Sequence, residues 1–383
     1  MITYKFRIYP NKEQREKLEF ALETCRQAYN ILLEELNNQC VIDRNMIQAI
    51  LPNLKICEPR FKEVYSKTLQ YECYRLFSNL SALRELKKRK KKVGRLRFKG
   101  KGWFKTINYN QSGFSLDSEN KRLKLSKIGD IKIKLHREVE GNIKQITIKK
   151  SIGKWYVSIV TDAMIRKERG NKIIGIDLGI KRYLMDSEGC SIEHPKILDN
   201  NLLELKTAYR SLSKKKLRSN NRKKAKLKVA KIYEKINNIR NDFLHKTSTN
   251  LIRKSKLIVH EDLNIKQMME QKFYNAKNIA DSSWNRFIQL LTYKAESAGC
   301  KVVKVNPKNT TKTCSQCGHL QDMPLYKRVF KCESCGLSMD RDYNSAINIL
   351  NKFLGKELTY VENNSSVPLV QELSMKQEAT SFT

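Results

Sequence analysis

Three acidic side chains stand at positions where an acid is unusual. Asp177 and Glu261 each lie at the end of a short, nearly continuous apolar run, and such runs are typical of buried strands. Asp342 stands at the start of a stretch with helical apolar spacing. Taken singly, Asp177 reads as a turn residue and Asp342 as a helix N-cap. Two acids at strand ends within one domain are less usual, and they indicate a site.

The chemistry of these acids follows from their charge. If the two strands are neighbours and the helix packs against them, three carboxylates meet at one edge of a sheet, where they repel one another unless cations lie between them. Oxygen ligands favour hard divalent ions, and a pair of Mg²⁺ ions cleaves phosphodiesters. The pattern therefore predicts Asp177, Glu261 and Asp342 as catalytic residues that bind two Mg²⁺. His260 is not assigned as a base, because it points to the opposite face of a strand from Glu261.

Two CxxC pairs predict a second metal site. Cys314 and Cys317 precede Cys332 and Cys335 by fourteen intervening residues, and a glycine follows each pair. This spacing lets four sulfurs reach one tetrahedral Zn²⁺, and four thiolates leave no open position, so the zinc is structural. A redox CxxC or a disulfide pair is the alternative, and two copies at this spacing favour zinc. The other six cysteines are expected to be core thiols: Cys25, Cys40, Cys57, Cys73, Cys190 and Cys300.

The charge of the chain indicates which classes of partner it binds. The 383 residues carry a formal net charge of +37, which calls for a nucleic acid, an anionic membrane surface or an acidic protein. Residues 87–105 hold eleven Lys or Arg and no acid, and residues 206–240 hold fourteen with one acid. Aromatic or apolar side chains lie between these cations, which favours contact with a phosphate backbone. No apolar run is long enough to span a membrane, and the start lacks the apolar region of a secretory signal.

The elements that must position these residues fall into an α/β region, a β-barrel or sandwich, and a helical lobe. Alternating apolar residues predict strands at 2–8, 112–116, 121–125, 130–136, 143–150 and 154–161. Helical spacing predicts one helix after the N-cap Asn11 and another over 63–92. Buried strands are predicted over 172–178 and 256–263 and a further strand over 301–305, with a helix or helical hairpin over 199–254 and a helix at 282–298.

Several motifs together resemble one family. They are GIDLG at 175–179, EDLN at 261–264, the double CxxC, and DRDYNSAINI at 340–349. The chain is identified on these motifs as a member of the TnpB (OrfB) family, transposon-encoded RNA-guided DNA nucleases related to type V CRISPR effectors. Asp177, Glu261 and Asp342 match the catalytic acids of that family, and Asp340 is then a turn or supporting residue. The resemblance spans about residues 1 to 355.

The resemblance implies a division of the chain and its partners. The implied parts are a wedge β-barrel at 1–10 and 93–168, a helical recognition lobe at 11–92, a RuvC-type ribonuclease-H-like nuclease domain at 169–305 and 338–356 with basic helices at 199–254, an inserted zinc ribbon at 306–337, and a disordered tail at 357–383. A guide RNA and double-stranded target DNA are the expected partners, with one protomer per RNA or a dimer. The expected location is the cytoplasm of a prokaryote, on the nucleoid.

Twelve residues are candidates for nucleic-acid contact, and ordinary surface or packing roles are their alternative. They are Lys67, Gln70, Tyr71 and Tyr74 as readers of a short DNA motif, Arg95, Arg97, Lys99 and Trp103 in the basic segment, and Lys214, Lys215, Arg222 and Lys223 in the basic helices.

The resulting hypothesis is RNA-guided DNA cleavage next to a short flanking motif. Three alternatives stay open: a nuclease-inactive RNA-guided repressor, a transposase or its accessory protein, and a plain zinc-ribbon protein that binds nucleic acid.

Overall fold

The computed structural model describes residues 1–39, 42–163, 169–270, 276–324 and 326–361. The chain divides into two compact units, Met1–Ile165 and Arg166–Thr383. Within the described residues no helix has the length and apolar character needed to cross a membrane. Residues 357–361 were predicted to belong to a disordered tail but form the end of the last helix, which continues through Val361; residues 362–383 lie outside the described part.

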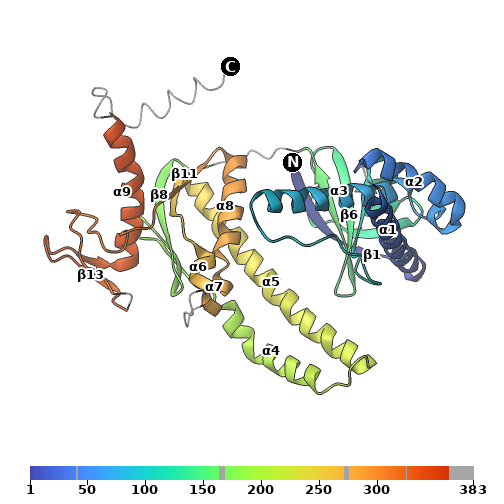
Figure 1. The fold of residues 1–383 in the computed structure, drawn as a ribbon. Coiled ribbons are helices and arrows are strands. Elements are labelled where there is room, and N and C mark those ends of the chain that lie inside the picture. The colour runs from blue at the N-terminus through green and yellow to red at the C-terminus, as the bar shows by residue number, and fades with distance from the viewer. Residues whose placement is uncertain (40–41, 164–168, 271–275, 325, 362–383) are drawn as a thin grey trace. The chain divides into compact units, whose positions relative to one another are not determined.

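The helices of the first unit form the predicted lobe (Figure 1). They are α1 (Lys12–Asn38), α2 (Arg44–Cys57), the short 3₁₀ helix η1 (Pro59–Lys62) and α3 (Ser66–Lys88). The predicted N-cap of α1 is confirmed, since the Asn11 side chain accepts a hydrogen bond from the Gln14 amide at 2.8 Å. Helix α2 was not predicted, because the second helical region was expected to begin only after Pro52 and Pro59. Ile47 and Leu51 lie in the same helix as Pro52 and are buried. Their packing outweighs the cost of a proline inside a helix, which is about 3 kcal/mol.

The strands of the first unit form one sheet. They are β1 (Ile2–Tyr9), β2 (Thr106–Asn110), β3 (Phe114–Asp117), β4 (Arg122–Leu125), β5 (Gly129–Lys134), β6 (Ile143–Ser151) and β7 (Lys154–Thr161), in the order β2-β6-β7-β1-β5-β4-β3. The predicted strand at 112–116 is displaced by the 3₁₀ turn η2 (Gln111–Gly113), and β2 was missed. Among the described residues the ladder has β2 and β3 at its ends, so the sheet is a half-barrel rather than a closed barrel.

The second unit is built on a mixed sheet with the order β10-β9-β8-β11-β12. Its strands are β8 (Lys172–Leu178), β9 (Arg182–Asp186), β10 (Ser191–Glu193), β11 (Ser255–Glu261) and β12 (Lys301–Val305). Strand β8 is parallel to β11 and β11 to β12, whereas β9 and β10 run antiparallel. The apolar runs predicted as buried strands are therefore confirmed.

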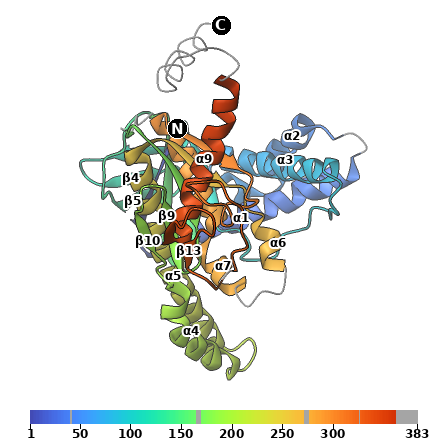
Figure 2. The ribbon, with the colours of Figure 1, turned by 90° about the vertical axis from the view of Figure 1, so that its left-hand side faces the viewer.

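Helices cover both faces of this sheet. The helices of the unit are α4 (Ile197–Ser213), α5 (Asn220–Lys254), α6 (Ile265–Glu270), α7 (Ala276–Ser282), α8 (Trp284–Ala298) and α9 (Arg341–Val361). Ile349 of α9 packs with Leu257 and Val259 of β11, while residues of α5 and α8 pack with Ile174 and Ile258 on the other face. Figure 2 shows α9 beside the small hairpin that contains β13 (Val329–Lys331), which pairs with β14 (Ser338–Asp340).

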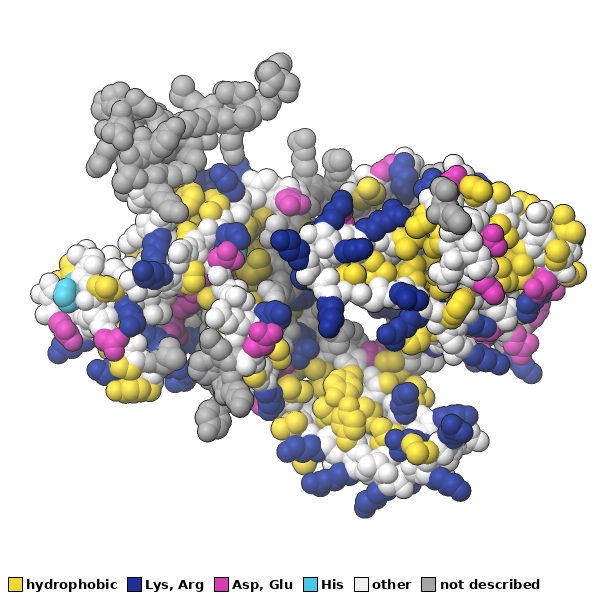
Figure 3. All heavy atoms as spheres, in the orientation of Figure 1, with side chains coloured by type: hydrophobic (Ala, Val, Ile, Leu, Met, Phe, Trp, Pro, Cys, Tyr) yellow, Lys and Arg dark blue, Asp and Glu magenta, His cyan; other side chains and the backbone are white. Residues whose placement is uncertain are grey.

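The basic stretch is a helical hairpin formed by α4 and α5, one of the two forms predicted. Its helices share a small apolar core that includes Leu205, Ala208, Val229 and Ile232. Lys and Arg side chains border an apolar patch on its surface (Figure 3). The hairpin is therefore a packed element, and its cations are not those of an unstructured tail.

Candidate active site

Strand alternation places two of the three predicted acids on one face of the sheet. Neighbouring residues of a strand point to opposite faces, so Asp177 shares the face of Ile173, which packs in the same cluster as α9. Glu261 likewise shares the face of Val259 in that cluster. In the parallel pairing of β8 and β11, Ile176 is opposite His260. The next position in each strand is the acid, so Asp177 and Glu261 end neighbouring strands at one edge.

Gly175 lets α9 approach this edge. A Cβ atom at Gly175 would lie 2.3 Å from the carbonyl oxygen of Ala346 and 2.8 Å from the amide nitrogen of Leu350. Only a residue without a side chain leaves room for the helix backbone at this distance. The glycine of the GIDLG motif thus sets the depth at which α9 packs, and Asp342 lies in the first turn of that helix.

The two acids of the DRD motif have different roles. Asp340 caps α9, since its Oδ1 accepts hydrogen bonds from the amides of Asp342 at 2.9 Å and Tyr343 at 3.3 Å. Its Oδ2 accepts from Arg182 of β9 at 2.7 Å. The predicted turn role of Asp340 fits this geometry, and the N-cap explanation for Asp342 is wrong. The Asp342 side chain does not cap the helix and instead accepts hydrogen bonds from Arg341.

The three carboxylates influence one another electrically. Burial raises the pKa of Asp177 well above its usual range, and the nearby negative charges of Glu261 and Asp342 raise it further. Burial also raises the pKa of Glu261, while a hydrogen bond from Thr310 and the charge of Lys352 oppose that shift. These are the effects expected where like charges gather with little solvent. A cation bound beside these acids would lower the pKa of both Asp177 and Glu261.

The acids are close but not drawn together around a common point. Among the described residues, one group of three or more His, Cys, Asp or Glu side chains has ligand atoms within 4.8 Å of one another, and it does not include these acids. Asp342 is held by its neighbours: Arg341 contacts its Oδ1 at 3.0 Å, and Arg328 at 3.8 Å. The donor set of three carboxylates fits hard divalent cations, and both arginine contacts fall on the same oxygen.

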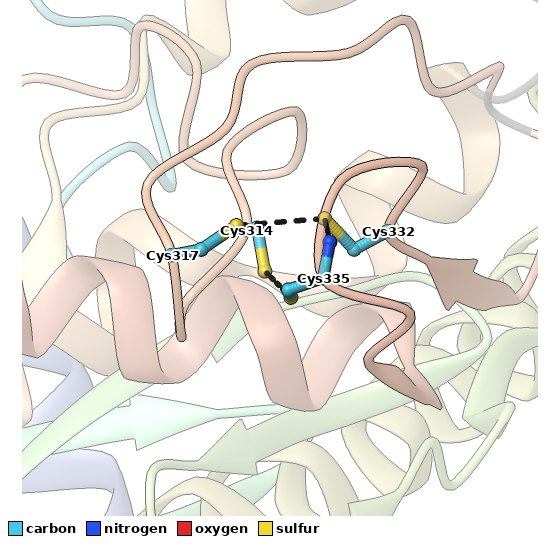
Figure 4. Close-up of side chains that lie close together, drawn as sticks. All are labelled: Cys314, Cys317, Cys332 and Cys335. Atoms are coloured by element: carbon cyan, nitrogen blue, oxygen red, sulfur yellow. Dashed lines mark hydrogen bonds between the residues drawn. The ribbon is translucent and has the colours of Figure 1, made fainter.

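The group within 4.8 Å consists of the four predicted cysteines (Figure 4). The sulfurs of Cys314 and Cys335 are 3.7 Å apart, and those of Cys317 and Cys332 are 3.6 Å apart. A tetrahedral zinc site with bonds of about 2.3 Å has sulfurs about 3.8 Å apart, whereas a disulfide would bring them to about 2.0 Å. The arrangement fits one metal ion and excludes the disulfide alternative in this structure.

Backbone geometry supports the cysteine cluster. Gly318 and Gly336, which follow the two pairs, have φ of +76° and +74°, a region that glycine adopts without strain. The amide of Cys335 donates to the sulfur of Cys332 at 3.5 Å. This bond, together with hydrogen bonds from the Ser334 amide and the Cys317 and Cys335 thiols, lowers the pKa of the Cys332 thiol to about 6, and a thiolate is the form that binds metal.

Sequence reasoning missed three residues between the two sites. Asn344 and Asn348 of α9 both donate hydrogen bonds to the carbonyl oxygen of Thr313, at 2.9 Å and 2.6 Å. Thr310, four residues before Cys314, donates to Glu261. The two asparagines stand four apart and so share one face of the helix, and that spacing was a signal that could have identified them.

The candidate DNA-reading residues share one face of α3. Lys67, Gln70, Tyr71 and Tyr74 follow helical spacing, and Tyr74 is 45% exposed. The Arg44 guanidinium lies 5.0 Å from the centre of the Tyr74 ring, and Lys67 donates to Ser112 at 3.2 Å. The face is therefore partly committed to contacts within the lobe.

The candidates of the basic segment lie between α3 and β2. Arg95 and Arg97 are exposed, and Trp103 is 67% exposed with the Lys99 ammonium 5.4 Å from its ring centre. The backbone of Lys99 is bonded in both directions to Asn30 of α1. The segment has no regular secondary structure, yet it is held against the lobe and presents an aromatic ring to solvent.

The hairpin candidates divide into two kinds. Lys214, Lys215 and Lys223 are exposed. Arg222 instead donates to the carbonyl oxygens of Leu212 and Lys215, each at 3.0 Å, where it closes the end of α4. The ordinary structural role of Arg222 thus has a direct observation behind it.

The remaining single residues follow prediction in part. Cys25, Cys73 and Cys300 are buried, but Cys57 and Cys190 are exposed and are not core thiols; Cys40 lies outside the described residues. His260 lies on the face opposite Glu261, where it is 8% exposed and burial lowers its pKa.

Three family models match the chain. Their descriptions are "Helix-turn-helix domain" for residues 1–40, "Probable transposase" for 154–272 and "Cas12f1-like, TNB domain" for 284–349. In the described residues 1–39 the structure has a strand and one long helix. The third match includes the four cysteines and Asp342.

Relatives extend over most of the chain. A protein of Streptomyces pristinaespiralis named "Putative RNA-guided DNA endonuclease" is 30% identical over 365 residues, covering 91% of this chain and 88% of the relative. "Putative RNA-guided DNA endonuclease InsQ" of Escherichia coli (strain K12) is 29% identical and covered to 91% in both chains. The fold resembles that of Cas12f1 in a complex with sgRNA and target DNA, with a TM-score of 0.55 and 18% identity over 89% of this chain and 83% of the other. By these matches, the chain belongs to the TnpB (OrfB) family.

Proposed function

We propose that this protein is an RNA-guided DNA endonuclease that hydrolyses phosphodiesters with two Mg²⁺ held by Asp177, Glu261 and Asp342. The observation that carries the proposal is that Asp177 and Glu261 lie on neighbouring strands at one edge, where burial and the nearby charges of Glu261 and Asp342 raise the pKa of Asp177. Family membership and the +37 charge of the chain support a nucleic-acid substrate. The unit that contains the acids is then a RuvC-type nuclease domain.

The chain's own residues supply oxygen ligands and compensating charge. Asp177 and Glu261 present carboxylates from the ends of two neighbouring strands, and Asp342 presents one from the first turn of α9. When bound, the two ions would activate the attacking water and stabilise the leaving oxygen. Arg341 holds Asp342 through Oδ1, which limits the rotation of that carboxylate and reduces its repulsion of the others.

The cysteine cluster is proposed to hold one structural Zn²⁺. Four sulfurs at tetrahedral spacing satisfy the ion completely, so the ion takes no part in cleavage. The predicted ribbon boundaries of 306–337 extend slightly, since β14 reaches Asp340. A metal here would stiffen the chain directly before α9.

RNA and DNA are the proposed partners, and the charge distribution indicates where they bind. The exposed cations of the hairpin, together with Arg95, Arg97, Lys99 and Trp103, suit contact with phosphates and bases. Lys67, Gln70, Tyr71 and Tyr74 stay proposals for reading a short DNA motif in the helical lobe, with the half-barrel as the wedge. Arg222 is now assigned to the hairpin itself. One protomer is proposed to bind each RNA.

The test is to express the chain from its native flanking DNA, purify it and sequence the RNA that copurifies. The complex is then given plasmids that match the guide part of that RNA, beside a randomised flank, in Mg²⁺. Guide-dependent cleavage next to one flanking motif is the expected result. Guide-dependent binding without cleavage would favour the repressor, and strand joining would favour a transposase. Guide-independent binding would leave a plain zinc-ribbon protein.

A further inference from the structure

The segment between β12 and the cysteine cluster contacts the carboxylate edge through one side chain. Thr310 is 2% exposed, and its hydroxyl lies within hydrogen-bonding distance of Glu261 Oε1 and of the Pro307 carbonyl oxygen, the latter at 3.0 Å. A hydroxyl has one hydrogen, and an ionised carboxylate is the stronger acceptor. The hydrogen therefore goes to Glu261, and it occupies one of the two carboxylate oxygens.

Helix α9 holds this threonine in place. The Asn348 side chain donates to the carbonyl oxygens of Thr310 at 2.9 Å and Thr313 at 2.6 Å. One turn earlier, Asn344 donates to Thr313 and accepts from the amide of Ser315 at 3.0 Å. The helix that carries Asp342 thus also holds the segment that bonds Glu261, and the same segment continues into Cys314.

We propose that Thr310 is a positioning residue that orients the Glu261 carboxylate for metal binding and connects it to the cysteine ribbon. The inference rests on the proposed function, because it assigns Glu261 as a metal ligand. With Oε1 bonded to Thr310, the other oxygen of Glu261 is directed by the threonine rather than by free rotation of the side chain. Residues that orient metal ligands typically change metal affinity by about 10-fold to 100-fold when they are lost.

The test compares Thr310→Val, which removes the hydroxyl at similar volume, with Thr310→Ser, which keeps it. Thr311→Val is the matched control one residue away. The full chain with its copurified RNA is titrated with Mn²⁺, and bound Mn²⁺ is measured by electron paramagnetic resonance. Zinc content and melting temperature are measured on the same samples. We expect Thr310→Val to bind Mn²⁺ about 10-fold more weakly, with Thr310→Ser and the control near wild type and zinc content unchanged in all.

Equal Mn²⁺ affinity in Thr310→Val and wild type would overturn the inference. So would equal weakening in Thr310→Val and Thr310→Ser, because the hydroxyl would then be irrelevant. Should Thr310→Val lose zinc or fail to fold, Thr310→Ala serves as the second variant, and normal Mn²⁺ affinity in it would be decisive against the proposal. A wild-type complex that binds Mn²⁺ but does not cut DNA would refute the proposed function and leave the role of Thr310 to be decided by the affinities.

Discussion

The cysteine cluster and the carboxylate edge are both candidate metal sites, and they differ in how closely the structure gathers their ligand atoms. The four cysteine ligand atoms lie within 4.8 Å of one another, whereas the three carboxylates do not meet that limit. Neutral thiols carry no charge with which to repel one another, the Cys335 amide donates a hydrogen bond to the one thiol whose pKa is lowered, Cys332, and tight turns hold the cysteines in place. Carboxylates at neutral pH repel one another.

Because the two sites differ in this way, different parts of the structure hold the ligands of each site in place. The ribbon is held by backbone geometry at two glycines and by the hairpin of β13 and β14. The carboxylate edge relies on surrounding side chains instead: Arg341 at Asp342 and Thr310 at Glu261. The ligands of the ribbon are therefore positioned mainly by its backbone, whereas those of the edge are positioned by neighbouring side chains.

The largest effect is expected from Asp177→Asn, which keeps the shape of the side chain and removes its charge. Cleavage should fall at least about a thousandfold, because a charged side chain that would hold the ions is lost, while RNA and DNA binding stay within twofold of wild type. Rates and binding are measured on the same purified complex. Asp262→Asn is the control, because Asp262 is exposed and pairs with Lys304. Undiminished cleavage by Asp177→Asn would remove this acid from the site.

Loss of the cysteine cluster should have the next largest effect. Cys332→Ser should abolish zinc binding and, through the loosened segment at 306–315, lower cleavage by roughly 10-fold to 100-fold. Zinc is measured by mass spectrometry and cleavage on the same preparation. Cys57→Ser, an exposed cysteine outside the cluster, should change neither. Full zinc content in Cys332→Ser would contradict the assignment of the cluster.

Gly175→Ala should disturb the carboxylate edge and leave the cysteine cluster intact. The new methyl group would meet the α9 backbone, at an overpacking cost of about 1–3 kcal/mol, so cleavage should fall while zinc content is retained. Gly355→Ala on the same helix is the control, since a Cβ there meets no atom of the described residues within 4 Å. Denaturant unfolding and cleavage assays distinguish the variants. Equal stability of the two alanine variants would show that α9 does not need this close approach.

A buried acid in the first unit tests whether a raised pKa alone makes a site. Burial raises the pKa of Glu72 to about 8, and Arg75 at 3.1 Å opposes the shift. Because the folded pKa exceeds the unfolded value, this glutamate stabilises the fold below about pH 4.5 and that contribution is lost as the pH rises towards 8. Glu72→Gln should therefore raise the melting temperature at pH 8 more than at pH 5, without lowering cleavage. A loss of cleavage would give Glu72 a role beyond packing.

Among the variants that lower cleavage, the smallest loss is expected from Asp340→Ala. It removes the cap of α9 and the partner of Arg182, a loss of about 1 kcal/mol, and cleavage should fall less than tenfold. Asp342→Ala should resemble Asp177→Asn. If the two alanine variants lose activity equally, the division of roles within the DRD motif is wrong.

Much of the site could be predicted because its signals are local. The apolar runs of β8 and β11 and the spacing of α9 are visible in short windows, and the CxxC spacing defines a tetrahedral site on its own. Arg182 and Thr310 were not found, because each acts on a residue far away in the sequence. Gly175 was quoted as part of a motif, but its role depends on how closely a distant helix packs.

The first unit was harder to predict in detail. The second helical region was predicted only from residue 63, after two prolines, yet Pro52 lies inside a helix, because tertiary burial outweighs local preference. Strand β2 was missed since Asn108, at an inner position of the strand, is polar yet only 8% exposed. Its side chain accepts a hydrogen bond from Thr147 of β6, a partner that no short window reveals.

Anomalous scattering from Mn²⁺, in crystals of the protein with its RNA and a DNA target, tests the central claim most directly. We predict two peaks bounded by Asp177, Glu261 and Asp342. Peaks elsewhere in the protein, or none beside these three acids while the same complex cuts DNA, would contradict the account.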